Sequence, residues 1–105
     1  MNQMFLIVLD LISTTHDYTA FFDTIKRLGP WWHYLKTGWV VQTQTRLNEV
    51  VDTLRQHIAE GDHFMVVDIS RMPRDGWLQG SAWDWLRAHE ADASSGNPGA
   101  STGNR

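Results

Sequence analysis

The chain has 105 residues, a formal net charge of −3 and no cysteine. Its length predicts one domain, the absence of cysteine excludes disulfides and thiolate chemistry, and the negative charge argues against strong, non-specific nucleic-acid binding. No apolar stretch approaches membrane-spanning length, and the N-terminus lacks a basic region followed by a long apolar run. A cytoplasmic location without membrane contact is therefore expected.

The first 90 residues are expected to form the domain. Residues 91–105 are rich in Gly, Ser and Asn and contain no large apolar residue, so a disordered C-terminal tail is predicted. A core this small is often completed by pairing with a second copy of the same chain. Six tryptophans support that expectation, because tryptophan is enriched at protein interfaces.

A continuous apolar run from Met4 to Leu9, closed by Asp10, predicts a central strand that is buried on both faces. A polar loop follows. Asp17 is expected to cap a helix that runs to about Leu28, because its apolar residues recur at helical spacing. The pair Gly29-Pro30 ends this helix.

Residues 31–35 and 39–43 predict the two strands of an aromatic-rich hairpin around a turn at Lys36-Thr37-Gly38. Strand alternation places the side chains of its first strand on two faces. Trp32 and Tyr34 are expected on one face, and Trp31, His33 and Leu35 on the other. These aromatic rings could stack on nucleic-acid bases, but packing in the core or in a dimer interface is the favoured interpretation.

The second half repeats the alternation of helix and strand. Thr45 is expected to cap a helix that ends at Gly61, and residues 64–69 predict the fourth strand. Residues 71–80 form a loop in which Trp77-Leu78 could add a short strand. Residues 81–89 predict a short helix capped by Ser81. The three C-terminal tryptophans are expected to anchor this segment to the sheet; they are Trp77, Trp83 and Trp85.

The order βαββαβ predicts an α+β fold, in which two helices cover one face of a four-stranded antiparallel sheet and the first and third strands are central. The other face must then be polar, capped by the C-terminal helix, or buried against another subunit. The apolar first strand favours burial of that face.

Asp10 is the main candidate for chemistry. In a dimer packed sheet to sheet, two copies of this carboxylate could approach across the two-fold axis and hold one hard cation such as Mg²⁺. The cation would activate water or stabilise the leaving oxygen in phosphodiester cleavage. The alternative is that Asp10 starts a turn, as aspartate commonly does.

His16 is a candidate general acid or base, since histidine titrates near neutral pH; the alternative is a solvated loop residue. Arg71 and Arg74 are candidate phosphate ligands, together with Lys36 in the hairpin turn, because loop arginines can grip phosphate with two hydrogen bonds. Ordinary surface charge is the alternative interpretation for all three.

The segments FLIVLDL, DYTAFFDTIKRLGPWWHYLKTGWVVQT and FMVVDIS resemble a group of small bacterial SinR-like proteins, over about residues 4–88. These proteins look like relatives of the small CRISPR-associated endoribonuclease, the second subunit of the spacer-integration complex. The resemblance implies a ferredoxin-like fold and a homodimer in which paired aspartates bind a divalent metal and cleave RNA or DNA. By its position at the end of the first strand, Asp10 corresponds to the metal-binding aspartate of that family. Trp77-Leu78 takes the role of a C-terminal strand that extends the partner's sheet.

Two hypotheses follow. The first is a metal-dependent, homodimeric nuclease-like protein that acts on RNA or DNA in a defence or toxin–antitoxin setting, with a defence-system protein as a further partner. The second is a non-catalytic dimeric scaffold or regulatory protein-interaction module. The aromatic richness, the negative charge and the lack of a second catalytic group favour the second hypothesis.

Overall fold

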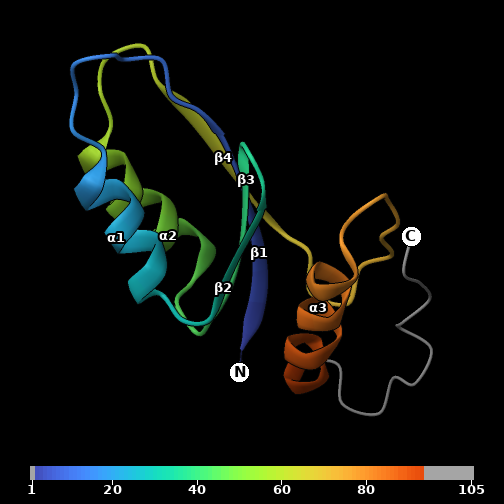
Figure 1. Ribbon diagram of the computed structural model, residues 1–105. Coiled ribbons are helices and arrows are strands. Elements are labelled where there is room, and N and C mark those ends of the chain that lie inside the picture. Colours follow the sequence, from blue (N-terminus) through green and yellow to red (C-terminus); the bar gives the residue numbers. More distant parts are fainter. Residues whose placement is uncertain (1, 94–105) are drawn as a thin grey trace.

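The computed structural model describes residues 2–93 and has a four-stranded antiparallel sheet with helices on both faces (Figure 1). In chain order the elements are β1 (Gln3–Asp10), α1 (Thr19–Arg27), β2 (Trp31–Leu35), β3 (Gly38–Thr43), α2 (Leu47–Leu54), a 3-10 turn (Arg55–His57), β4 (His63–Asp68) and α3 (Gly80–Ala93). The predicted α+β class is confirmed. Three residues of the predicted tail belong to α3, and its remainder lies outside the described residues.

The strands lie in the order β2-β3-β1-β4, and each neighbouring pair is antiparallel. In the register, Ile7 of β1 lies between Trp39 of β3 and Val66 of β4. The central place of β1 agrees with its apolar sequence, because a central strand is shielded along both edges. The predicted burial on both faces is only partly right: Phe5, Ile7 and Leu9 are buried on one face, but Val8 and Asp10 are exposed on the other. Within residues 2–93, no helix is long and apolar enough to cross a membrane.

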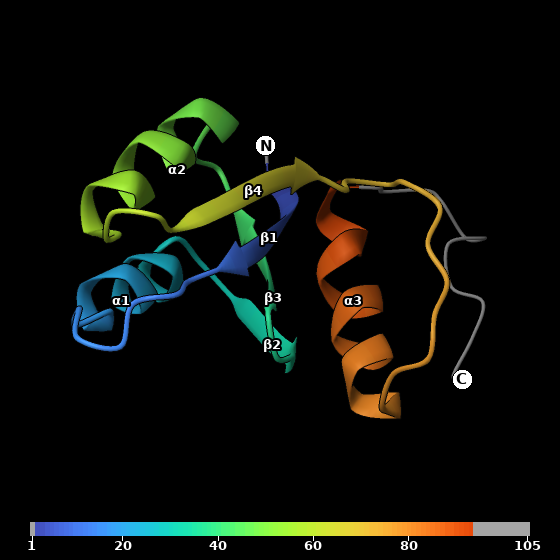
Figure 2. The ribbon, with the colours of Figure 1, turned by 90° about the horizontal axis from the view of Figure 1, so that it is seen from above.

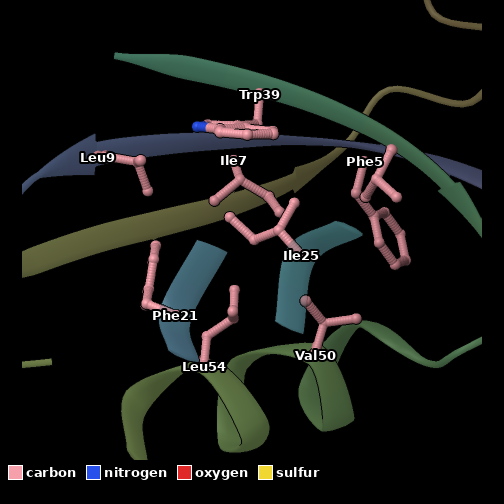
Figure 3. Packing of buried hydrophobic residues seen from close by; sticks show 9 residues of the cluster. Phe5, Ile7, Leu9, Phe21, Ile25, Trp39, Val50 and Leu54 are labelled. Atoms are coloured by element: carbon pink, nitrogen blue, oxygen red, sulfur yellow. The ribbon is translucent and has the colours of Figure 1, made fainter. Parts of the chain in front are cut away.

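The helices α1 and α2 cover one face of the sheet (Figure 2). Their apolar stripes meet the alternate side chains of β1 and β3 that point to this side (Figure 3). Phe21 and Ile25 of α1 are fully buried there, as are Val50 and Leu54 of α2. The buried members of this main core are Phe5, Ile7, Leu9, Phe21, Ile25, Trp39, Val41, Val50 and Leu54.

The opposite face is partly capped by α3, one of the three arrangements that the sequence left open (Figure 2). A second cluster joins α3 to the sheet; its buried members are Met4, Trp32, Val40, Ala82, Trp83 and Leu86. The indole Nε1 of Trp32 donates a hydrogen bond to the carbonyl of Ala82 at 3.1 Å, and the side-chain amide of Gln42 donates to the carbonyl of His89. The helix lies beside the half of the sheet that holds the start of β1 (Figure 1).

Several predicted helix starts are displaced. Asp17 does not occupy the cap position of α1, which is Tyr18, although its carboxylate accepts the N–H of Thr19 at 2.9 Å. The second helix begins after Arg46 rather than after Thr45. The third begins at Gly80, so Ser81 lies in its first turn. In each case the predicted cap rests on the type of one side chain, and the helix starts within one or two residues of the position that this side chain predicts.

The predicted strand at Trp77-Leu78 is wrong, because residues 71–79 form neither strand nor helix. The expectation that Trp77 anchors this segment is also wrong: Trp77 is 84% exposed. Trp83 is buried in the cluster under α3, and Trp85 packs against that cluster, so two of the three tryptophans do anchor the segment.

A bulge in β2 corrects the predicted faces of the hairpin. Trp32 lies opposite Val40, but Leu35 lies opposite Gly38, so the register shifts by one residue between Trp32 and Leu35. An extra residue on one strand turns the following side chains to the other face. Leu35 therefore shares the face of Val8, which also pairs with Gly38, instead of the face of Trp31 and His33 as predicted.

Candidate functional site

Asp10 is exposed at the last position of β1, and its register partner on β4 is His63. Directly opposed residues point to the same face of a sheet, with Cβ atoms about 5 Å apart. Asp10 and His63 therefore lie together on the face that α3 partly caps. Within residues 2–93, the Asp10 carboxylate makes no hydrogen bond or ion pair with another side chain.

His16 is engaged elsewhere. Its Nε2 is hydrogen-bonded to the carbonyl of His57 at 2.8 Å, which requires the tautomer that carries a proton on this nitrogen. Its ring also meets the edge of Tyr18, with centroids 4.7 Å apart. These contacts tie the loop after β1 to the segment after α2, and they leave His16 without a contact to Asp10.

Asp62 is a buried carboxylate that the sequence did not single out. It is 6% exposed and accepts three hydrogen bonds: from the Tyr18 hydroxyl at 2.6 Å and from the N–H groups of Ile12 and Ala59 at 2.8 Å each. Burial raises its pKa, but the hydrogen bonds from Tyr18, Ile12 and Ala59 outweigh burial and hold the pKa below its ordinary value. Burial and the bond to Asp62 raise the pKa of Tyr18.

The Asp62 network fixes the loop that leaves β1 to the turn that enters β4. The charged Asp62 carboxylate stabilises this contact between the two segments through three hydrogen bonds, and protonation of the carboxylate would weaken all three. The only sequence signal for it is an aspartate next to Gly61, at a turn before an apolar strand. Such an aspartate looks like an ordinary turn residue.

The three basic candidates are not brought together into one site. Arg74 donates through Nη2 to the carbonyl of Ile69 at 2.6 Å and to the Glu90 carboxylate at 2.7 Å, and Glu90 is only 6% exposed. Arg74 thus fastens the loop after β4 to α3. Arg71 is exposed with a φ of 55°, and its N–H donates to the same carboxylate. Lys36 is exposed in the turn between β2 and β3, whereas Arg71 follows β4, the strand at the opposite edge of the sheet.

Mg²⁺ is usually bound by one or two carboxylates that share it with water and substrate phosphate. Across residues 2–93, no group of three or more metal-ligating side chains lies close enough to hold an ion. Asp10 and His63 supply one carboxylate and one imidazole, so a single copy offers at most a partial site. A magnesium site at Asp10 would need the second carboxylate from another copy.

An exposed apolar surface lies beside Asp10, on the half of the sheet that α3 leaves uncovered. We call it the bare-sheet surface; its members, with exposed fractions, are Val8 36%, Tyr34 43%, Leu35 46%, Met65 59% and Trp77 84%. Leu35, Val8 and Met65 form one row across the sheet, since Leu35 and Val8 both pair with Gly38 and Val8 also pairs with Met65.

A hollow of about 370 Å³ adjoins this row at Leu35; it is lined by Tyr34, Leu35, Trp77, Leu78 and Gln79. Sequence reasoning missed the surface because it depends on the bulge in β2 and on how far α3 reaches over the sheet. In the sequence, the aromatic residues of the hairpin were the one indication of this surface.

The sequence gives no significant match to a protein-family model, to a curated protein or to a solved structure. The residues and contacts described above are therefore what supports any function.

Proposed function

We propose that this chain is a cytoplasmic, homodimeric protein-interaction module without catalytic activity. The bare-sheet surface supports this proposal most directly, since four large apolar side chains of the sheet are exposed on one half of a face whose other half is covered by α3, and Trp77 of the loop before α3 adjoins them. Contiguous apolar patches of this kind on a small domain usually mark an interaction site. The candidate chemistry is sparse by comparison, because Asp10, His16 and the basic residues are not assembled.

A nuclease assay tests the absence of catalysis. The purified chain is incubated with labelled single-stranded RNA and double-stranded DNA in the presence of Mg²⁺ or Mn²⁺, beside an Asp10→Ala variant. We expect no cleavage by either protein, and sedimentation equilibrium of the chain should give a dimer. Cleavage that requires both the metal and Asp10 would overturn the proposal.

The second candidate function is a metal-dependent nuclease related to the small CRISPR-associated endoribonucleases, acting in a defence setting. One observation favours it: the Asp10 carboxylate is exposed, beside His63, at the edge of the bare-sheet surface. The strand order β2-β3-β1-β4, with α1 and α2 on one face, supports the ferredoxin-like relationship on which this candidate rests. Two copies that met through the bare-sheet surface could bring their Asp10 carboxylates to one ion.

Asp10→Asn separates the two candidates without changing the size of the side chain. For a nuclease, loss of the charge should abolish both cleavage and the stabilisation of the dimer by Mg²⁺. For an interaction module, dimer formation should be unaffected by the substitution and by the metal.

A further inference from the structure

Trp77 is the most exposed large apolar side chain of the described residues, yet the loop that carries it is held at both ends. On its N-terminal side, Arg74 is bound to Ile69 and Glu90. On its C-terminal side, Leu78 packs against the cluster under α3, and the carbonyl of Gln79 accepts the N–H of Ala82. A tryptophan on a fixed loop loses little entropy on binding, which is typical of an interface anchor.

A receptor for such an anchor lies next to it on the same chain. The hollow beside Trp77 is lined by Trp77 itself together with Tyr34, Leu35, Leu78 and Gln79. Because the projecting Trp77 ring and the apolar hollow lie side by side, two copies related by a two-fold axis can match ring to hollow twice. Each Trp77 would then enter the hollow of the other copy.

Other occupants fit this surface less well. Residues 94–105 contain only Pro98 and Ala100 as apolar side chains, too few to fill it. Charges of both signs lie beside the row, since Lys36 follows Leu35 and Asp10 lies on the same face of β1 as Val8. Charges of opposite sign at the rim can pair with those of a rotated second copy and give no net attraction to a polyanion.

The exposed area also agrees with a dimer. From their exposed fractions, the five side chains of the bare-sheet surface present on the order of 500 Å² per copy, given about 150–250 Å² for a large side chain. Two copies would bury about 1,000 Å² in total, the lower limit for a specific interface. The expected complex is therefore a reversible dimer rather than an obligate one.

We infer that the partner of the bare-sheet surface is a second copy of this chain, and that reciprocal insertion of Trp77 into the hollow lined by Tyr34, Leu35 and Leu78 holds the dimer together. This inference rests on the proposed homodimeric function and adds the surface and the residue that carry it. The two-fold arrangement leaves both Asp10 carboxylates at the rim of the same interface.

The test is sedimentation equilibrium of the full chain over a concentration series, for the wild type, Trp77→Ala and the control Leu47→Ala. Leu47 is 40% exposed at the start of α2, on the opposite face of the sheet. We expect Trp77→Ala to weaken the dimer by about 30-fold or more, as for an anchor residue, and Leu47→Ala to leave it unchanged. Because Trp77 is exposed, far-UV circular dichroism should be the same for all three proteins.

A wild type that dimerises together with an equally dimeric Trp77→Ala variant would overturn the Trp77 inference while leaving the homodimer in place. A wild type that stays monomeric throughout would overturn both. Cross-linking gives a second readout, since the chain has no cysteine. A short bismaleimide should link two copies of Gln79→Cys, at the hollow, and not two copies of Glu60→Cys, in the loop before β4.

Discussion

The packing of α3 against the sheet can be tested with two adjacent tryptophans. Trp32 is 3% exposed, contacts the α3 cluster and donates its Nε1 hydrogen to Ala82, whereas Trp31 points to the other face and is 42% exposed. Replacement by alanine removes the same atoms at both positions. The two variants should therefore differ mainly in the buried area that they lose.

The difference in exposure is about 40% of a tryptophan surface of roughly 250 Å², or about 100 Å². At about 25 cal/mol per Å², the free energy of unfolding should fall by roughly 2.5 kcal/mol more for Trp32→Ala than for Trp31→Ala. A residual cavity would add to that difference. Trp32→Phe keeps most of the area and loses the hydrogen bond to Ala82, so it should cost about 1 kcal/mol from the hydrogen bond, with a smaller packing term.

Urea unfolding followed by far-UV circular dichroism measures all three variants, and the free energy follows from the midpoint and the slope. The slope should stay constant if α3 unfolds together with the sheet. Equal losses for Trp31→Ala and Trp32→Ala would refute the reasoning, because they would mean that α3 does not shield Trp32 in solution.

Three further predictions concern the loops. Gly29 has a φ of 154° and a Cβ there would lie 2.0 Å from a β3 carbonyl oxygen, so Gly29→Ala should lower the melting temperature sharply, whereas Gly80→Ala, with open space around it, should change it little. The lowered pKa of Asp62 stabilises the fold above the unfolded-state pKa of about 3.8, and this stability is lost as the pH falls through the pKa of the folded state. Asp62→Asn should therefore have a lower melting temperature at pH 7, and its melting temperature should fall less on acidification than that of the wild type. Melting temperatures that fell equally with pH for both proteins would contradict this. Arg74→Ala should lower the melting temperature and Arg71→Ala should not, and equal melting temperatures would leave the ion pair with Glu90 without a role.

Local patterns in the sequence were enough to predict the strands and helices of the main core. β1 is apolar at six consecutive positions, and the apolar residues of α1 and α2 recur every three or four residues, so their buried faces are determined by spacing alone. The hairpin was equally visible from its short glycine-containing turn. Each of these features depends on residues that are close together in the chain.

The features that escaped prediction depend on contacts between distant segments. The bulge in β2 reverses the face of Leu35, and no residue in the hairpin marks it. The hydrogen bonds of Asp62 reach Tyr18 and Ile12, which lie 44 and 50 positions before Asp62 in the chain. Trp77 is exposed on a loop that Arg74 fastens to α3, although tryptophan side chains are highly buried on average.

The two candidate functions are linked through the same surface, since the described part of one copy, residues 2–93, offers a single carboxylate at Asp10 and no group of three or more side chains that could hold an ion. A metal-dependent nuclease therefore requires the dimer, whereas a dimer does not require the metal. Loss of the dimer in Trp77→Ala should abolish any cleavage together with association, whereas Asp10→Asn should abolish cleavage and the effect of Mg²⁺ while the dimer persists. Cleavage that persisted in monomeric Trp77→Ala would show that its active site lies outside this interface and does not use paired Asp10 carboxylates.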